Sequence, residues 1–295
     1  MSIEPPAATP RSVRPPGAGV APRDRGRGMT VGRRPSRFWR IRQGLHPRFR
    51  FALIVTSLAI PLLIWIVLNV TRAVDPIFLP GPLSVLNAAR GMAESGVLRQ
   101  DIGASLQRIG IGFGLAVLIS VPLGLAMGTF KSIEALCEPV IGLVRYMPAT
   151  AFVPLLLIWF GLGEEPKIAL IVIGVMFFNT LMTANVVWQV PTEMIKVAFT
   201  LGASNATVFT KVIFPYSIPG MIDAMRVNLA AAWNLIVVAE LVASEQGLGF
   251  RIVRAQKFLQ IDQIFVVLVV IGLLGLASDV ALRTLRNRLA PWSQE

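Results

Sequence analysis

The sequence has little of the chemistry that catalysis and metal binding use most often. Its 295 residues include one cysteine and one histidine, and only 15% of them are charged. The single cysteine, Cys137, excludes a disulfide framework within the chain and any metal site built on cysteines. The single histidine, His46, lies in a basic N-terminal segment, so the remainder lacks the usual triad base and the usual metal ligand. We therefore expect no catalytic residues and no metal site.

The formal net charge of +12 is concentrated at the N-terminus. Residues 1–50 hold twelve arginines and two acidic residues, a net charge of +10, which leaves +2 for the rest. This segment is rich in proline and glycine over 1–36 and mixes aromatic residues with arginine over 38–49. It is predicted to form a disordered basic cytoplasmic tail with an interfacial approach to membrane lipid. Nucleic-acid binding through the tail is the less favoured alternative, and we expect none.

Long apolar runs predict an all-α integral membrane protein. A helix needs about 20 apolar residues to cross a bilayer, and 54% of this sequence is hydrophobic. The first run, 51–70, is too long for a signal peptide and is predicted to be a retained span. Two further stretches carry prolines or charges, which membrane helices tolerate where they face protein or a water-filled cavity. The six predicted spans are 51–70, 109–130, 139–163, 168–190, 218–243 and 263–278.

The arginine-rich tail orients the spans. Positive residues favour the cytoplasmic side, so the amino terminus is predicted to be cytoplasmic, and six spans return the carboxyl terminus to the same side. The loops between the spans do not follow this rule, so the orientation rests on the tail alone.

Residues 191–219, PTEMIKVAFTLGASNATVFTKVIFPYSIP, predict a helix-turn-helix between the fourth and fifth spans. Thr192 is expected to cap a first helix, and Gly202 to end it in the left-handed conformation. Ser204 is expected to cap a second helix, which Pro215 terminates. The segment has too many apolar residues for a solvated loop, so we expect it to insert into a groove on a partner.

The same segment resembles the coupling loop of the permease subunits of ABC importers. Gly202, nine further residues and then Val212-x-Phe214-Pro215 match the glycine…I-x-L-P spacing of that loop. Its usual E-A-A opening falls on Lys196-Val197-Ala198, so a lysine replaces the acidic residue. The resemblance assigns residues 191–217 as an ATPase-coupling loop. Its site residues are Lys196, Val197, Ala198, Gly202, Ala203, Ser204, Val212, Phe214 and Pro215.

The resemblance extends over about residues 51–293, the predicted permease domain. The sequences FLPGP at 78–82, WFGLG at 159–163, AE at 239–240, GLGF at 247–250 and RLAPW at 288–292 are similar to the nitrate/taurine/sulfonate/bicarbonate group of these permeases. The resemblance implies a bacterial cytoplasmic-membrane importer that works by alternating access. It also implies three partners: cytoplasmic ATPase subunits, an extracytoplasmic substrate-binding protein and a second permease copy, most simply a homodimer. The sequence contains no G-x-x-x-x-G-K-[ST] motif, so ATP and magnesium are expected in the partner ATPase and no cofactor in this chain.

Two other classes of protein remain as alternatives. A proton-coupled secondary transporter would use Glu240 or Asp279 as the proton carrier, although no inverted repeat of broken helices is evident. A membrane-embedded enzyme would need a convergent cluster of histidines or carboxylates, which the apolar part of the sequence does not offer.

Several polar residues inside the spans are candidates for lining the solute path. Each has a structural alternative: snorkelling of Arg145 to the interface, contacts between helices for the neutral residues, and for Glu240 an ion pair with a cation such as Arg145. Asp223 and Arg226 are expected to pair within one helix, and Gly112, Gly114, Gly124 and Gly128 to allow close helix packing. The pore-lining candidates are Arg145, Asn179, Thr183, Trp233, Asn234 and Glu240.

Overall fold

The computed structural model describes residues 46–293, so residues 1–45 of the tail predicted over 1–50 lie outside the described residues, and 47–50 begin the first helix. The regular elements of this part are all helical. The chain divides into two compact units between residues 59 and 60, inside the first helix, and the packing below is that of the second unit. The α-helices are α1 (Pro47–Val70), α2 (Pro82–Glu94), α3 (Val97–Thr129), α4 (Lys131–Val144), α5 (Val153–Phe160), α6 (Glu165–Trp188), α7 (Thr192–Thr200), α8 (Asn205–Val208), α9 (Phe214–Ala243), α10 (Leu248–Lys257) and α11 (Ile261–Leu289).

Five of these helical stretches are long and apolar enough to cross a membrane, or six if the bent pair of α4 and α5 counts as one span. The predicted number of spans and the all-α class are therefore confirmed. The predicted boundaries were too short where charges interrupt a helix. Helix α3 begins twelve residues before position 109, and α11 extends eleven residues beyond position 278, because a charge that pairs with a neighbouring helix does not end a membrane helix.

The predicted interruption of the third span is a sharp bend. Helix α4 and the helical segment Ala149–Phe160 meet at 81°. Pro148 lies at the break in an extended conformation, with φ −60° and ψ 122°. A proline has no N–H to donate to the preceding turn and disfavours helical geometry in the residue before it, so the helix stops there.

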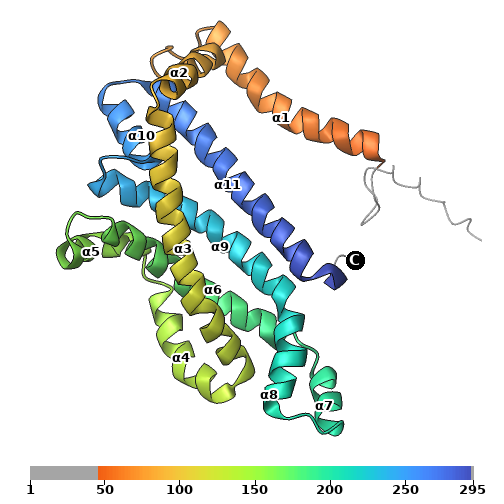
Figure 1. Cartoon of the computed structure of the whole chain (residues 1–295). Coiled ribbons are helices and arrows are strands. Elements are labelled where there is room, and N and C mark those ends of the chain that lie inside the picture. The colour runs from red at the N-terminus through yellow and green to blue at the C-terminus, as the bar shows by residue number, and fades with distance from the viewer. Residues whose placement is uncertain (1–45, 294–295) are drawn as a thin grey trace, which may run out of the picture. The chain divides into compact units, whose positions relative to one another are not determined.

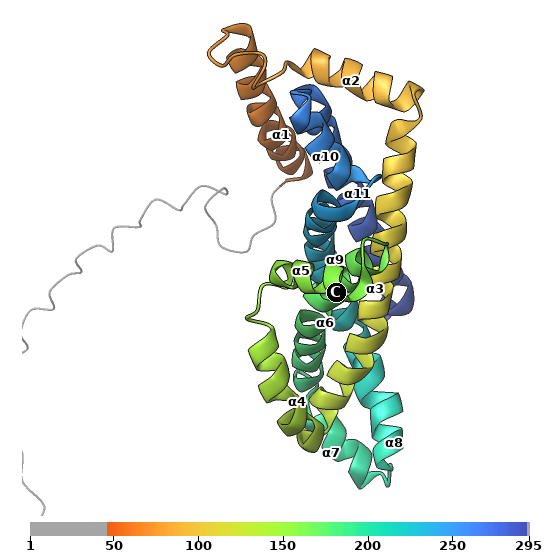
Figure 2. The same ribbon diagram turned by 90° about the vertical axis from the view of Figure 1, so that its left-hand side faces the viewer.

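Helices α3, α6 and α9 pack together through the middle of the unit (Figures 1 and 2). Three glycines on α3 allow the close approach to α6. A Cβ atom on Gly124 would lie 2.5 Å from the carbonyl oxygen of Thr180, and Gly112 and Gly128 are similarly crowded by α6 side chains. The prediction of close packing is confirmed at these three positions. It was wrong for Gly114, which is exposed and has nothing within 4 Å of a built Cβ.

We expect Gly124→Ala to destabilise the protein by about 1–3 kcal/mol, because the backbone of α6 cannot move away from the added methyl group without disturbing other contacts. Gly114→Ala on the same helix is the matched control and should change the unfolding temperature little. Thermal unfolding of the purified protein in detergent measures both variants. Equal unfolding temperatures for the two would show that the α3–α6 approach is not tight.

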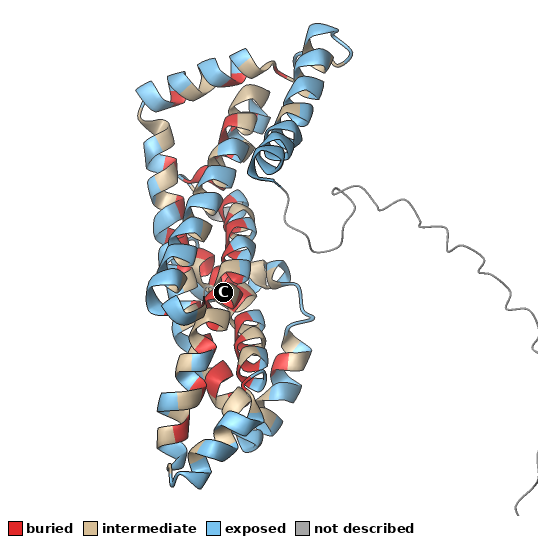
Figure 3. Ribbon diagram, turned by 90° about the vertical axis from the view of Figure 1, so that its right-hand side faces the viewer, coloured by how far each residue is buried: buried red, intermediate tan, exposed pale blue. Residues whose placement is uncertain are grey.

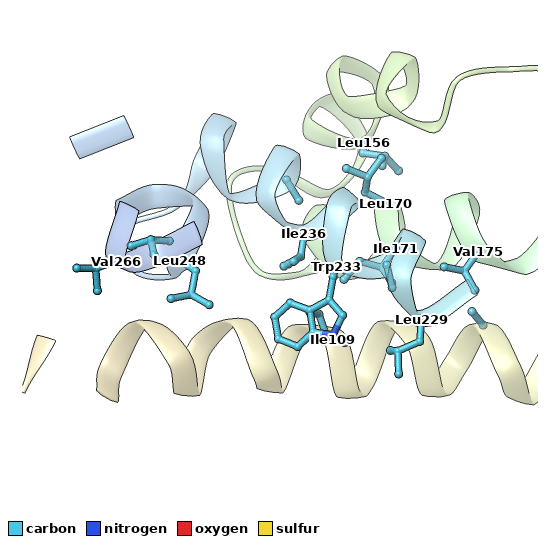
Figure 4. Close-up of a cluster of buried hydrophobic side chains, with 14 of the residues drawn as sticks. Ile109, Leu156, Leu170, Ile171, Val175, Leu229, Trp233, Ile236, Leu248 and Val266 are labelled. Atoms are coloured by element: carbon cyan, nitrogen blue, oxygen red, sulfur yellow. The ribbon is translucent and has the colours of Figure 1, made fainter. Parts of the chain in front are cut away.

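Buried apolar side chains of α2, α3, α5, α6, α9, α10 and α11 form the main core. The cluster includes Trp233 of α9, Ile109 of α3, Ile171 of α6, Leu248 of α10 and Val266 of α11, all labelled in Figure 4. Figure 3 shows buried positions along the inward sides of the helices and exposed positions elsewhere. Many of the exposed residues are large and apolar, as expected of surfaces that face lipid or a partner chain.

Candidate functional site

Residues 191–217, referred to below as the hairpin, occupy one end of the bundle, where α7 and α8 lie (Figure 1). Gly202 ends the first helix with φ +82°, and Ser204 caps the second by accepting a hydrogen bond from the backbone N–H of Thr207. Both local predictions are confirmed. Thr192 is not a cap: Pro191 holds the N-cap position of α7, and the structure gives it no side-chain cap.

The predicted termination at Pro215 was wrong. Helix α8 continues through one π-helical turn, Phe209–Ile213, into α9, and the two together form a 38-residue stretch, Asn205–Val242. In the π turn the N–H of Phe214 donates to the carbonyl of Phe209, five residues back. This wider turn lets the helix pass the proline without the clash that an α-helical register would impose. The hairpin is therefore continuous with a membrane-spanning helix.

The hairpin has one face against the bundle and one open face. Ala198, Ala203 and Val212 pack on a cluster that includes Leu125 of α3 and Val187 of α6. On the open side, Val197 is 58% exposed and Leu201 is 82% exposed. Lys196 and Ser204 are also exposed, and Phe214 and Pro215 begin α9.

The six pore-lining candidates do not form one cluster. Asn179 is fully buried and donates to Ser120 of α3 at 2.6 Å, and Thr183 is fully buried one turn further along α6. Trp233 and Glu240 are buried as well, whereas Arg145 and Asn234 are exposed. Arg145 stacks on its neighbour Tyr146 and donates to its hydroxyl, and Asn234 donates to a backbone carbonyl of its own helix. Their role in lining a path stays a prediction.

Glu240 pairs with Arg108, and not with Arg145 as the sequence suggested. The Nη1 atom of Arg108 lies 2.7 Å from Glu240 Oε1, and Ser105 donates to the same carboxylate at 2.8 Å. Arg108 also donates through Nη1 to the carbonyl of Gln246 at 2.8 Å. Arg108 also forms a bidentate pair with Glu164, which directly precedes α6. Its Nε donates to Oε2 of Glu164, and its Nη2 donates to Oε1 at 2.8 Å. One guanidinium thus joins α3, α6 and α9.

Side chains of α3 and α9, including Glu240, also accept hydrogen bonds from the N-terminus of α10. Gly247 N donates to Asp101 at 2.9 Å, Leu248 N to Ser105 at 3.0 Å and Gly249 N to Glu240 at 2.8 Å. Helix α10 has no capping side chain of its own. Side chains of α3 and α9 therefore satisfy its first N–H groups, and their negative charge suits the positive end of the helix dipole. Arg251 of α10 completes the contact with an ion pair to Asp101 at 2.7 Å.

We call these residues, with Lys167, the Arg108 cluster; it comprises Asp101, Ser105, Arg108, Glu164, Lys167, Glu240 and Arg251. It lies at the end of the bundle away from the hairpin, where α10 is (Figure 1). Sequence reasoning identified only Glu240. The signal it missed was the spacing of Asp101, Ser105 and Arg108, since residues four and three apart share one face of a helix.

Glu164 differs from the other acids of the cluster in being half-exposed, with 54% of its side chain accessible. Hydrogen bonds from Arg108, and with smaller effect from Lys167, lower its pKa to about 2 against the opposing effect of burial. The carboxylate is therefore ionised at neutral pH.

Two charged residues near the hairpin end are also paired. Asp223 accepts from Arg226 at 3.0 Å, which confirms the predicted intrahelical pair. Arg226 further forms a bidentate pair with Asp279 of α11, at 2.8 and 2.9 Å. Within residues 46–293, no group of three or more His, Cys, Asp or Glu side chains is placed to hold a metal ion.

Comparison with known proteins gives consistent similarities. The family described as "Binding-protein-dependent transport system inner membrane component" matches residues 120–292. A probable ABC transporter permease protein of Brucella abortus is 38% identical over 230 residues, which cover 78% of this chain and 91% of that protein. The taurine transport system permease protein of Escherichia coli is 35% identical over 246 residues, 82% of this chain and 90% of that one. In fold, the chain resembles a solved inward-facing MetNI methionine ABC transporter, with a TM-score of 0.54, 17% identity and coverage of 63% of this chain and 94% of that chain.

Proposed function

Because this chain belongs to the family of binding-protein-dependent transport system inner membrane components, we propose that it is the permease subunit of an ATP-driven importer. Its solute is a small anion or zwitterion of the nitrate, bicarbonate, taurine or sulfonate type, moved into the cytoplasm by alternating access. The observation that carries the proposal is the similarity, over most of both chains, to a permease named for taurine transport. The chain itself is a transport component, and ATP hydrolysis belongs to partner subunits.

The open face of the hairpin is the proposed contact with those ATPase subunits. Its exposed apolar residues, Val197 and Leu201, provide the surface that a groove on a partner would cover. This assignment places the hairpin and both chain termini in the cytoplasm of a bacterium. It places the Arg108 cluster at the outer side, where an extracytoplasmic binding protein would deliver the solute.

The continuity of α8 and α9 gives the proposed contact a mechanical route through the membrane. The stretch Asn205–Val242 starts next to the Gly202 turn and contains Glu240 near its other end. A displacement of the hairpin by an ATPase would therefore reach the Arg108 cluster through one helix. A second copy of the chain, most simply as a homodimer, would supply the other half of the solute path.

Affinity purification from native membranes in mild detergent, followed by mass spectrometry, tests the proposal. We expect a P-loop ATPase at about equal stoichiometry, together with more than one copy of this chain per complex. Recovery without an ATPase, under conditions that keep a known importer intact, would contradict the proposal. Uptake would then be expected to follow a proton gradient instead of ATP.

A further inference from the structure

A cleft of about 580 Å³ opens beside the Arg108 cluster, between the segment that joins α5 to α6 and the segment that joins α9 to α10. Its volume lies within the range of about 300–1,000 Å³ that is common for small-molecule sites. Its wall includes Arg108, Glu164 and Lys167, together with Ser244 and Glu245 from the segment that joins α9 to α10. The Oγ atom of Ser244 is buried and has no hydrogen-bond partner among the described residues.

The charged groups of the wall are unequally buried. The side chains of Arg108 and Lys167 are 6% and 5% accessible, whereas that of Glu164 is 54% accessible. The two cations are therefore fixed in the protein, and the carboxylate that pairs with them faces the cleft. Since Glu164 precedes α6 and follows Gly161 and Gly163, its side chain can turn toward water at far smaller cost than either cation.

The carboxylate of Glu164 lies between the guanidinium of Arg108 and the ammonium of Lys167, in the place where a small oxyanion would fit. Glu164 Oε1 accepts from Arg108 Nη2 and from Lys167 Nζ, both at 2.8 Å, while Oε2 takes the second branch of the guanidinium fork. A planar fork with an adjacent ammonium group recognises any small oxyanion with two oxygens in the same plane, including carboxylate, nitrate and sulfonate.

We propose that Arg108 and Lys167 form a transient binding site for the oxyanion group of the transported solute, which displaces Glu164 from it. The assignment rests on the proposed import of a small anion or zwitterion. In the empty state Glu164 and Glu240 balance the two cations. Exchange of Glu164 for one negative group of the solute keeps this balance, and a neutral or purely cationic solute would break it.

An internal competitor also suits transport, because a transport site must release its ligand. The apparent dissociation constant of such a site equals the intrinsic constant divided by the fraction of time that the site is free. If Glu164 occupies the cations for nine-tenths of the time, its removal should tighten anion binding about tenfold. A purely structural tie predicts the reverse, since loss of Glu164 would leave buried cations unpaired and weaken every property of the region.

The test uses the complete transporter, purified with its ATPase and placed in phosphatidylcholine nanodiscs. Methanesulfonate and nitrate are titrated, and their dissociation constants are measured by calorimetry for the wild type and for four variants. We expect Glu164→Gln to bind both anions about tenfold more tightly and Lys167→Gln to lose binding. Lys167→Arg should retain binding because it keeps the charge. Glu165→Gln, an exposed carboxylate in the next position, is the matched control and should stay near the wild-type value.

Opposite effects of Glu164→Gln and Lys167→Gln support the site, and changes in the same direction, or an absence of binding in all variants, overturn it. Unfolding temperatures measured without anion exclude misfolding as the cause.

Nanodiscs that contain phosphatidylglycerol distinguish the two possible sources of the oxyanion, the solute and a lipid headgroup. Loss of methanesulfonate binding in those discs alone would assign the site to a lipid headgroup and overturn the solute assignment. If the ATPase co-purifies with the chain but Glu164→Gln binds both anions as the wild type does, this inference is overturned and the proposed function stands.

Discussion

Replacement of Gly202 by valine is expected to abolish ATP-driven uptake while the protein remains inserted in the membrane. Gly202 has φ +82°, and nothing lies within 4 Å of a Cβ built on it. The cost of valine is therefore conformational and not steric crowding, about 1–3 kcal/mol for a left-handed β-branched residue. The hairpin relieves this strain by changing the angle between its two helices, which moves Val197 and Leu201 away from the surface proposed to contact the ATPase.

Gly202→Asn is the matched control, because asparagine tolerates the left-handed region far better than valine. We expect the asparagine variant to retain most of its uptake and of the co-purified ATPase. For the valine variant, the dissociation constant of the ATPase should rise at least about tenfold, which corresponds to about 1.4 kcal/mol of binding free energy. Equal uptake by the valine variant and the wild type would remove the hairpin from the coupling role proposed for it.

Glu240→Gln is expected to lower the stability of the protein by about 3–5 kcal/mol. Glu240 is 1% exposed and accepts from Arg108, Ser105 and Gly249 N. The glutamine has the same shape, but it removes one of the two countercharges of a buried guanidinium and places an amide donor against other donors. Because the carboxylate holds α3, α9 and α10 together, the loss should lower the unfolding temperature of the whole bundle.

Thermal unfolding in detergent, followed by loss of the monodisperse peak in gel filtration, measures this effect. Glu134→Gln serves as the control. Glu134 pairs with Lys131, whose side chain is 84% exposed, and such surface pairs contribute about 0–1 kcal/mol. A Glu240→Gln variant that unfolds at the same temperature as Glu134→Gln would show that the Arg108 cluster does not stabilise the fold.

The features that sequence analysis predicted correctly are those set by local chemistry. The left-handed turn at Gly202 and the cap at Ser204 depend on a few adjacent residues. The number of spans follows from apolar length, which the bilayer imposes on any sequence. Pro215 shows the limit of a local rule, because a proline does not always end a helix: a π turn precedes Pro215, and Pro122 and Pro219 lie inside α3 and α9. Nothing in the sequence signals the π turn that precedes it.

The Arg108 cluster depends instead on the tertiary arrangement. Arg108 directly precedes one predicted span and Arg145 lies inside another, and either one satisfies the expectation that Glu240 has a cationic partner. Arg108 and Glu240 are 132 residues apart, and their pairing follows from the packing of α3 against α9. Arg145 instead lies at the break that follows α4, where it is exposed and donates to the hydroxyl of Tyr146. A charge such as Arg108, at the end of a predicted loop, can therefore belong to the interior of a longer helix.

The separation of these partners along the chain has a consequence for biosynthesis. Ser105 and Glu240 are 135 residues apart, and Asp101 and Arg251 are 150 apart. At 5–20 residues per second, Arg108 waits roughly 3–11 s for Glu164, 56 residues later, whereas Asp101 waits roughly 8–30 s for Arg251. During that longer interval Asp101 of the nascent helix has no ion-pair partner from α10. Chains truncated before residue 240 lack the partners that Glu240 and Arg251 supply to α3, so we expect pulse-chase labelling to show that they are degraded faster than the full-length protein.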